Sequence, residues 1–414
     1  MQSKPTQKIA IIGAGAAGLM AAITASKSGI KVHLYEQNNK PAKKILASGN
    51  GRCNISNSTF SSSDYAGQNP DFSSFCLQAF SFSQLQKFCK NMGLFLNILD
   101  DGRAYPLSNE AKSVALAFEN SALSSGVEIF NEHLISQIEK KEGKFFLHTS
   151  LNISEPYDKV LICTGSEAAP QLGGSSSGYE LASSLGHSIT PSYPSLVQLH
   201  INSSIHEKMS GAKQEAEVTL YINAKKEQSI KGDILFTKYG ISGFAILDIS
   251  QMASEALLNY QPVDIALDLL PKFDRQGLSS QLLSTANTLP EYTIENILNG
   301  LLPSKIARYL LEDAKIPPST LAKNMHTKMS KQIVSKIKDW RFEISGTHGF
   351  KHAEVSGGGV NTDEVNDKTM ESTLCKGLYF AGEVLDIVGR RGGFNFQFAF
   401  ASAYIAGKSM SQSK

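Results

Sequence analysis

Three glycines near the start of this 414-residue sequence, Gly13, Gly15 and Gly18, have the spacing of a phosphate-binding turn. They follow an apolar run at residues 8–12, which has the length of a parallel strand buried on both faces, and they open an apolar stretch with helical character. The first glycine permits a tight turn, the second lets backbone approach a pyrophosphate, and the third lets the helix pack on the strand. The helix N-terminus then offers unpaired N–H groups to phosphate. A tight turn without a ligand is the alternative.

A carboxylate follows the next predicted strand. We expect the helix to end at Gly29, and residues 31–35 to form a second strand that stops before Glu36. In this position Glu36 would accept hydrogen bonds from an adenosine ribose. Because a carboxylate tolerates a free 2′-hydroxyl but repels a 2′-phosphate, FAD or NAD fits better than NADP.

A segment rich in glycine and small polar residues comes next, at residues 45–57 (ILASGNGRCNISN). Residues 49–51 can adopt unusual φ angles and bring N–H groups close to a flat ring or a phosphate. Lys44 and Arg52 could offset the charge of a pyrophosphate. A plain NAD-binding domain would continue its alternation of helix and strand here, so the loop favours the longer ligand, FAD. A solvated surface loop is the alternative.

Two later strands are expected to end at the same crevice. Residues 158–165 end in Thr-Gly, and residues 377–386 contain a strand that ends in glycine and acidic residues. Two glycines then precede a nearly all-apolar stretch at 394–407, which predicts a buried helix. Its N-terminus could stabilise negative charge on the N1/O2 edge of a reduced flavin. Among its phenylalanines we expect only Phe394 to contact the cofactor and the others to pack in the core.

The residues expected to bind the cofactor lie at these strand ends, in the glycine-rich loop or at the start of the last helix. They are Gly13, Gly15, Ala16, Ala17, Gly18, Glu36, Gln37, Lys44, Ser48, Gly49, Asn50, Arg52, Cys53, Asn54, Leu134, Thr164, Gly165, Gly382, Glu383, Asp386, Gly392, Gly393, Phe394 and Asn395. Cys53 is interpreted as a small residue that packs near the cofactor, with an activated thiolate as the alternative.

Composition limits the classes of partner. The 40 basic and 38 acidic residues give a net charge of +2, which offers no electrostatic footprint for nucleic acid or an anionic membrane. The five cysteines are scattered without a C-x-x-C pair, which argues against disulfides and a zinc site and suits a reducing cytosol. No apolar run approaches the ~20 residues of a membrane span. We therefore expect a cytoplasmic monomer or weak dimer with no nucleic-acid, membrane or metal partner.

Taken together, these stretches resemble a known family. The motifs ASGNGRCN, PSLVQL, GDILFTKYGISG, GGGV…TMES and GLYFAGEVLD…GGFN are similar in order and spacing to the BaiN-like (YhiN-type) FAD-dependent flavoproteins of the two-dinucleotide-binding-domain superfamily. The resemblance spans nearly the whole chain. One position departs from it: Val388 stands where the family pattern has an acidic residue, and Arg390 and Arg391 follow. Substrate preference is therefore not carried over.

The resemblance implies an α/β fold with a Rossmann-like, glutathione-reductase-type FAD-binding domain that is split in sequence. Composition agrees, because short alternating runs give way to helical segments in the middle of the chain. The expected domains are residues 1–189 and 347–414 for the FAD-binding domain, 190–265 and 336–346 for an inserted β-barrel, and 266–335 for a small inserted helical domain.

His348, His352 and Tyr239 are the candidate catalytic residues. The two histidines lie just where the chain is expected to re-enter the FAD-binding domain, where a histidine can act as a base; structural roles are the alternatives. No second G-x-G-x-x-G follows a strand, so a separate NAD(P)H domain is not expected. We expect an FAD-dependent oxidoreductase that exchanges hydride between flavin and either NAD(P)H, as a transient co-substrate, or a small organic substrate. The alternatives are a flavin oxidase using oxygen in the manner of amine oxidases, a tRNA-modifying or RNA-binding flavoprotein, and a flavin-bearing sensor.

Overall fold

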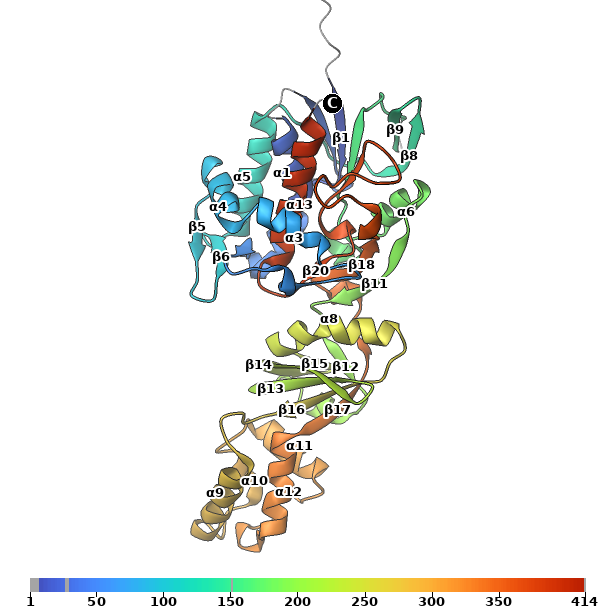
Figure 1. Cartoon of the computed structure of the whole chain (residues 1–414). Helices are drawn as coiled ribbons and strands as arrows, with labels where there is room; N and C mark the ends of the chain where they lie inside the picture. The colour runs from blue at the N-terminus through green and yellow to red at the C-terminus, as the bar shows by residue number, and fades with distance from the viewer. Residues whose placement is uncertain (1–6, 27–29, 150–151, 413–414) are drawn as a thin grey trace, which may run out of the picture. The chain divides into compact units, whose positions relative to one another are not determined.

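The computed structural model describes residues 7–26, 30–149 and 152–412 (Figure 1). The expected helix end at Gly29 lies outside these residues. The chain divides into two compact units. The first comprises Met1–Tyr193 and Glu354–Lys414, and the second comprises Pro194–Ala353. Each is described by itself below.

The first unit is built on a five-stranded sheet in the order β19-β10-β1-β2-β7, in which all neighbours are parallel. Its strands are β1 (Lys8–Ile12), β2 (Lys31–Tyr35), β7 (Glu128–Phe130), β10 (Lys159–Ile162) and β19 (Leu378–Phe380). The central strands β1 and β10 are almost entirely buried, as expected for continuous apolar runs. Because the strands are parallel, their carboxyl ends share one edge, and the residues that follow them lie close together.

Helices α1 (Ala16–Ser26), α5 (Ala111–Ser124) and α13 (Phe394–Ser411) pack on one side of this sheet (Figure 1). A Cβ at Gly407 would lie 2.7 Å from the carbonyl oxygen of Ala21, so α13 and α1 approach closely there. The Phe400 ring stacks on Phe118 with centroids 5.1 Å apart. The prediction that the C-terminal helix is buried is therefore confirmed.

The first unit has several smaller elements. They are α2 (Lys43–Ala47), the 3-10 turn Ser48–Gly51, β3 (Ser56–Asn57), β4 (Tyr65–Ala66), α3 (Phe72–Ala79), α4 (Phe82–Asn91), β5 (Leu96–Ile98), β6 (Arg103–Pro106), β8 (Ile135–Lys141), β9 (Lys144–Thr149), α6 (Ser177–Ser184), β11 (Ile189–Ser195), β18 (Val355–Val360) and β20 (Val388–Gly389). Strands β8 and β9 form an antiparallel hairpin.

The second unit contains a closed, antiparallel, six-stranded barrel in the order β12-β15-β14-β13-β16-β17. Its elements are β12 (Leu199–Ile201), α7 (Ile205–Lys208), β13 (Lys213–Ile222), β14 (Lys225–Thr237), β15 (Gly240–Ser242), α8 (Phe244–Leu258), β16 (Val263–Asp268), α9 (Arg275–Thr288), α10 (Ile294–Leu298), α11 (Ser304–Asp313), α12 (Thr327–Lys338) and β17 (Trp340–Thr347). Along β13, Ala216, Val218 and Leu220 are fully buried, and the residues between them face outward.

The helices α9 to α12 cover one part of the barrel core. In α11 and α12 the buried residues recur every three or four positions, for example Ile306 and Leu310, or Ile333 and Ile337, which is the pattern of amphipathic helices. The expected fold class, a Rossmann-like α/β protein with a β-barrel and helices between its two sequence halves, is confirmed. In the part of the chain that the structure describes, no helix is long and apolar enough to cross a membrane.

Candidate cofactor-binding and active site

The turn after β1 requires glycine at two positions. Gly13 has a φ of 104°, and a Cβ there would lie 2.6 Å from the carbonyl oxygen of Cys163. A Cβ at Gly18 would lie 1.8 Å from the carbonyl oxygen of Gly13. At Gly15, in contrast, a Cβ would meet nothing within 4 Å. The backbone at the start of α1 therefore has open space beside it, where unpaired helix N–H groups can bind a pyrophosphate.

The carboxylate of Glu36 is held in place at the end of β2 and is only 7% exposed. Its Oε2 accepts a hydrogen bond from the N–H of Ala14 at 2.9 Å, and its Oε1 accepts from the N–H and Nδ2 of Asn38 at 2.8 and 2.6 Å. Each carboxylate oxygen has two acceptor sites, so Oε2 can still accept from a ligand hydroxyl. The Ala14 contact joins the predicted ribose-binding carboxylate to the glycine-rich turn. Asn38 was not among the predicted residues, although it is only two positions from Glu36.

Two other predicted residues lie near Glu36: Gln37 is next to it in the chain, and Leu134 is near it through the fold. The side-chain amide of Gln37 donates to the carbonyl oxygen of Gly173 at 2.7 Å, which ties it to a neighbouring loop. Leu134 is 46% exposed, and its neighbour His133 donates its backbone N–H to the carbonyl oxygen of Glu36 at 2.9 Å. Leu134 therefore follows directly on a residue that is hydrogen-bonded to the predicted ribose-binding residue.

Lys44 and Glu383 form an ion pair, with Nζ and Oε2 3.1 Å apart. The other oxygen of Glu383 accepts from Ser166 Oγ at 2.7 Å and from the Ser356 N–H at 3.1 Å. Ser166 directly follows the predicted Thr164-Gly165 strand end, and that adjacency is the signal that could have identified it. Ser356 carries no such signal. The Lys44 charge is therefore balanced by a carboxylate at the edge of the sheet.

The glycine-rich loop has the left-handed backbone that its composition predicts. Gly49 and Asn50 have φ angles of 58° and 56°, and residues 49–52 are exposed. Cys53 is fully buried, and burial raises its pKa to about 12, which favours the packed thiol over the activated thiolate. The Oδ1 of Asn54 is buried without a hydrogen-bond partner in the described ranges. An unmatched acceptor of this kind fits a ligand that carries an N–H donor, as a flavin ring does.

The loop and the start of α13 lie side by side, although they are far apart in sequence. A Cβ at Gly393 would lie 2.4 Å from the carbonyl oxygen of Ser56, and the Nδ2 of Asn57 donates to the Gly392 carbonyl oxygen at 3.3 Å. Asn395 accepts a hydrogen bond from the Gly389 N–H at 2.8 Å and donates to the Gly389 carbonyl oxygen at 2.7 Å, which fixes the preceding turn.

Three residues of this C-terminal segment have environments that the sequence did not predict. Phe394 is 2% exposed and packs beside Tyr65, so it shares the core environment of Phe398. Asp386 is 2% exposed, and burial raises its pKa. Arg390 makes an ion pair with Asp64 at 2.7 Å and lies over the Phe394 ring, so its charge is compensated.

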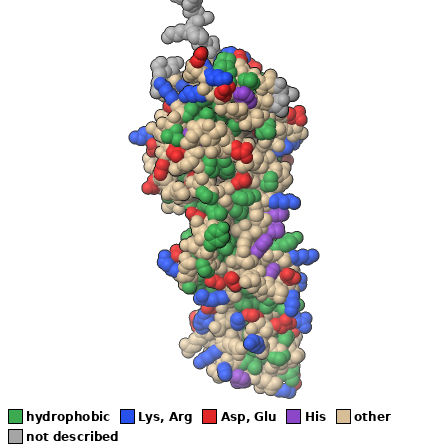
Figure 2. Space-filling model, turned by 90° about the vertical axis from the view of Figure 1, so that its right-hand side faces the viewer, with side chains coloured by type: hydrophobic (Ala, Val, Ile, Leu, Met, Phe, Trp, Pro, Cys, Tyr) green, Lys and Arg blue, Asp and Glu red, His purple; other side chains and the backbone are tan. Residues whose placement is uncertain are grey.

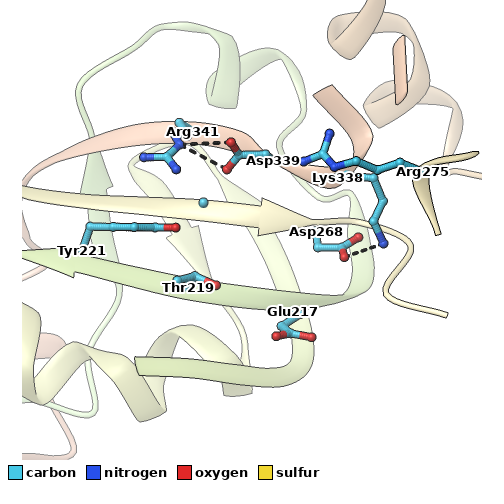
Figure 3. Close-up of a pocket in the computed structure, with 9 residues that line it drawn as sticks. Glu217, Thr219, Tyr221, Asp268, Arg275, Lys338, Asp339 and Arg341 are labelled. Carbon is cyan, nitrogen blue, oxygen red and sulfur yellow. Dashed lines mark hydrogen bonds and ion pairs between the residues drawn. The ribbon is translucent and has the colours of Figure 1, made fainter. Parts of the chain in front are cut away.

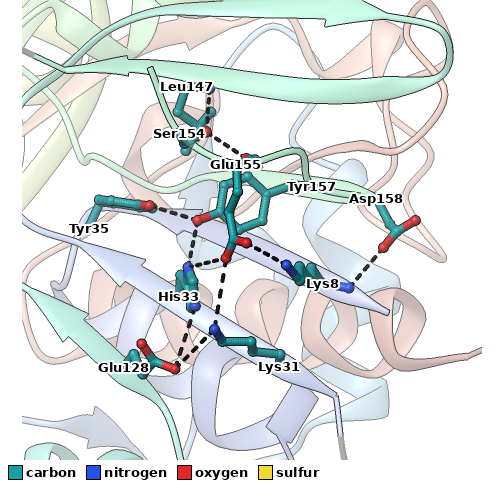
Figure 4. A network of polar contacts seen from close by, with 10 residues as sticks. All are labelled: Lys8, Lys31, His33, Tyr35, Glu128, Leu147, Ser154, Glu155, Tyr157 and Asp158. Atoms are coloured by element: carbon teal, nitrogen blue, oxygen red, sulfur yellow. Dashed lines mark hydrogen bonds and ion pairs between the residues drawn. The ribbon is translucent and has the colours of Figure 1, made fainter. Parts of the chain in front are cut away.

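A buried polar network contacts His33 and Tyr35 of β2, the strand that directly precedes Glu36. Figure 4 shows the Tyr157 hydroxyl between His33 and Tyr35, at 2.6 Å from His33 Nδ1 and 2.7 Å from Tyr35 Oη. Burial is the main cause that lowers the pKa of His33, so the ring is neutral at pH 7. Glu128 and Glu155, together with nearby lysines, surround the group. The network anchors the strand that precedes Glu36, the predicted ribose-binding carboxylate.

All of the residues predicted to bind the cofactor belong to the first unit, whereas the three predicted catalytic residues lie together in the second. The Tyr239 ring stacks on His348 with centroids 4.6 Å apart at 29°, and the His348 and His352 rings are 4.0 Å apart at 31°. His200, which no motif identified, has its Nε2 3.1 Å from the Nδ1 of His348. Burial and the neighbouring histidines lower the pKa of His348.

A separate polar pocket of about 300 Å³ lies on the outer surface of the barrel (Figure 3). Its charges are paired: Lys338 with Asp268 at 2.6 Å, and Arg341 with Asp339 at 3.1 Å. The Arg341 guanidinium lies 4.5 Å from the centre of the Tyr221 ring. None of the predicted site residues lines this pocket. Among the described residues, no group of three or more His, Cys, Asp or Glu side chains could hold a metal ion.

The chain matches the family described as "HI0933-like protein Rossmann domain" over residues 7–409. It belongs to the HI0933-like family. The resemblance found in the motifs is thereby confirmed, and this HI0933-like protein is an FAD-dependent oxidoreductase. The open space at Gly15, the fixed carboxylate of Glu36 and the unmatched acceptor of Asn54 all fit FAD.

Relatives of this HI0933-like protein are similar over their full lengths. The "3-dehydro-bile acid delta(4,6)-reductase" of Clostridium scindens is 33% identical over 98% of this chain and 99% of its own. The "Ribosomal RNA dihydrouridine synthase" of Escherichia coli is 31% identical over 98% of each chain. Among solved structures, the 3-ketosteroid-Δ4-(5α)-dehydrogenase of Rhodococcus jostii RHA1 covers 100% of this chain and 99% of its own, at 12% identity and a TM-score of 0.48.

Proposed function

We propose that this protein is an FAD-dependent reductase that saturates a carbon–carbon double bond conjugated to a carbonyl group. The names of its two full-length relatives support this proposal. A delta(4,6)-reductase of a 3-dehydro-bile acid and a dihydrouridine synthase reduce different molecules, a steroid and a uracil ring. In both molecules, however, the double bond is conjugated to a ring carbonyl. The type of reaction that the two relatives share is therefore better supported for this chain than either of their substrates is.

Several residues of the first unit would hold the cofactor. The turn at Gly13–Gly18 and the N-terminus of α1 would bind the pyrophosphate, and Glu36 would bind the adenosine ribose. The loop at residues 48–54 and the segment Gly392–Asn395 would flank the isoalloxazine ring. When bound, FAD supplies the hydride for the reduction, with NAD(P)H as the proposed source of electrons.

Saturation of a double bond also consumes a proton, which a side chain has to deliver. We retain His348 as the proposed donor. Its hydrogen bond with His200 places one N–H between the two rings, so a proton that one ring gives up can be replaced through the other. His352, whose ring lies against that of His348, and Tyr239 complete this group.

One observation favours a uridine of RNA as a second candidate substrate. The segment from the start of α9 to the end of α12, Arg275–Lys338, contains nine Lys and Arg residues but only four Asp and Glu residues. The net charge of +2 describes the whole chain and does not show that basic residues are concentrated in this segment. An excess of basic residues in one segment suits a phosphate backbone, so the prediction of no nucleic-acid partner needs a direct test.

The proposal is tested with purified, FAD-loaded protein, NADPH and three acceptors. The acceptors are a steroid 3-ketone with conjugated double bonds, the same steroid with its ring saturated, and an unmodified ribosomal RNA fragment. We expect the conjugated ketone, the RNA or both to gain two hydrogen atoms by mass spectrometry, and the saturated steroid to remain unchanged. NADPH consumption without a reduced product, accompanied by hydrogen peroxide, would instead identify the protein as an oxidase.

A further inference from the structure

Three stacked rings of the second unit form a platform whose two end residues are exposed to solvent. Tyr239, His348 and His352 stack in sequence, and His200 meets His348 edge-on at 5.3 Å. Tyr239, at one end of the stack, is 57% exposed, and His352 is exposed at the other. Figure 2 shows histidine side chains gathered on one face of the molecule, near Lys and Arg side chains. The exposed rings at the two ends of this stack offer flat faces on which a ligand ring can stack.

The backbone holds this platform in a fixed position. Lys238 and Tyr239 are the two residues of the tight turn between β14 and β15, because Thr237 and Gly240 are paired across it. Gly240 allows the turn to pass close to β12: a Cβ there would lie 2.1 Å from the Leu199 carbonyl oxygen. On the other side, the His348 N–H donates to the carbonyl oxygen of Gln198 at 2.9 Å. The rings are therefore presented without a large entropy cost on binding.

The platform offers a nucleotide mainly its ring faces. Burial and the neighbouring histidines lower the pKa of His348, and burial and His206 lower that of His200, so neither ring is a source of positive charge at pH 7. Lys238 adjoins Tyr239 in sequence. A fixed, exposed aromatic ring is the kind of surface on which a nucleotide base stacks.

We propose that the Tyr239–His348–His352 platform binds a nucleotide, with its base stacked on the exposed face of Tyr239. The proposal rests on the proposed function for the source of that nucleotide, which is either the NAD(P)H that supplies electrons or a nucleotide of an RNA substrate. A steroid ring system is a poorer match, because it lacks the flat conjugated face that stacking requires.

Binding of NADPH is measured with the photoreduced, FAD-loaded protein and binding of the RNA probe with the oxidised protein, so that neither probe can react with the flavin. The probes are NADPH and a fluorescein-labelled single-stranded oligouridylate. Tyr239→Ala removes the stacking face, Tyr239→Phe keeps it, and Tyr260→Ala is the matched control, since Tyr260 is a 96% exposed tyrosine of the same unit. We expect Tyr239→Ala to weaken binding of one probe by about fivefold or more, whereas Tyr239→Phe and Tyr260→Ala stay within about twofold of the unchanged protein.

The two probes distinguish the sources. Loss confined to NADPH identifies the electron donor as the ligand, and loss confined to oligouridylate identifies an RNA nucleotide. The platform proposal is overturned if neither probe binds, or if Tyr239→Ala binds both as tightly as the unchanged protein. Reduction of a conjugated ketone by photoreduced protein is measured in parallel and needs no nucleotide. If that reduction persists while nucleotide binding fails, only the platform is wrong; if nucleotide binds but no ketone or uridine is reduced, only the proposed function is wrong.

Discussion

Lys44 and Glu383 lie 339 residues apart in the sequence, yet their side chains form an ion pair of 3.1 Å. Lys44 belongs to α2, which follows β2 in the chain, and Glu383 follows the edge strand β19. The pair therefore joins the two halves of the first unit that the second unit separates in sequence. Ser166, which bonds the same carboxylate, adds the end of β10 to this connection.

Breaking this pair is predicted to weaken cofactor retention. In Lys44→Met, Glu383 keeps its bonds to Ser166 and Ser356 but loses its counter-ion, so we expect a loss of about 1 kcal/mol in the free energy of unfolding and faster release of FAD. Lys44→Arg is the matched control because it keeps the charge. Urea unfolding and the flavin-to-protein absorbance ratio after gel filtration check both effects. Equal FAD retention in the two variants would contradict the assignment of Lys44.

The Glu36 assignment predicts a stronger effect on the cofactor. Glu36→Arg places a cation at the ribose-binding position and removes the acceptor for the Ala14 N–H, so we expect the protein to be purified without FAD. Glu36→Gln retains one acceptor oxygen and is expected to keep part of the FAD. The visible spectrum and the flavin content after heat release report the result. Full yellow colour in Glu36→Arg would show that this carboxylate does not bind the cofactor.

Cys53 is predicted to be unreactive. Because burial raises its pKa to about 12, the thiolate is nearly absent at pH 8. Iodoacetamide should therefore leave Cys53 unmodified in the folded protein while labelling it in urea, as peptide mass spectrometry would show. We also expect Cys53→Ala to retain reductase activity within about twofold, since the side chain only packs. Rapid alkylation of the folded protein would contradict the buried position.

The Tyr157 network is predicted to stabilise the first unit. Tyr157→Phe leaves His33 Nδ1 and the Tyr35 hydroxyl without their shared partner, which should lower the free energy of unfolding by about 1–3 kcal/mol. Tyr260→Phe serves as the control, because Tyr260 is 96% exposed. Urea unfolding monitored by circular dichroism distinguishes the two. Equal unfolding midpoints would mean that the network contributes no net stability.

Acid is predicted to destabilise the protein through its buried and half-buried histidines. Burial lowers the folded-state pKa of His33, His187 and His348 below the ordinary value of 6.5, so below that pH the unfolded chain binds more protons than the folded one. Stability should therefore be constant above about pH 7 with respect to these groups and fall as the pH drops below 6.5. Unfolding midpoints between pH 7.5 and 5.5 measure the slope, and His33→Gln should reduce it.

Much of the nucleotide-binding half could be predicted because its constraints are local. Gly13 and Gly18 are required by contacts within one strand–turn–helix segment, and Glu36 follows the next strand directly. The alternating runs of the middle segment likewise predicted an antiparallel sheet or barrel, because the burial of β13 follows its two-residue period; the choice of a barrel came from the family resemblance.

The remaining site residues depend on contacts that no local pattern contains. Ser356 and His200 reach their partners through tertiary packing, and the pairing of Arg390 with Asp64 joins segments more than 300 residues apart. Phe394 could not be distinguished from its neighbours in an all-apolar helix, because burial there depends on what α13 packs against. Sequence reasoning therefore predicted a cofactor-binding region at the carboxyl ends of the parallel strands, but it predicted only some of the polar residues that contact this region.

The most direct test of the proposed function is a single-turnover experiment without oxygen or NADPH. FAD-loaded protein is photoreduced, then mixed with a conjugated steroid ketone, with its saturated counterpart, or with a uridine-containing RNA, while the visible absorbance of the flavin is followed. We predict that the conjugated ketone or the RNA restores the oxidised spectrum and that the saturated ketone does not. If neither conjugated acceptor restores it while air does so within seconds, the protein is not a reductase of conjugated double bonds.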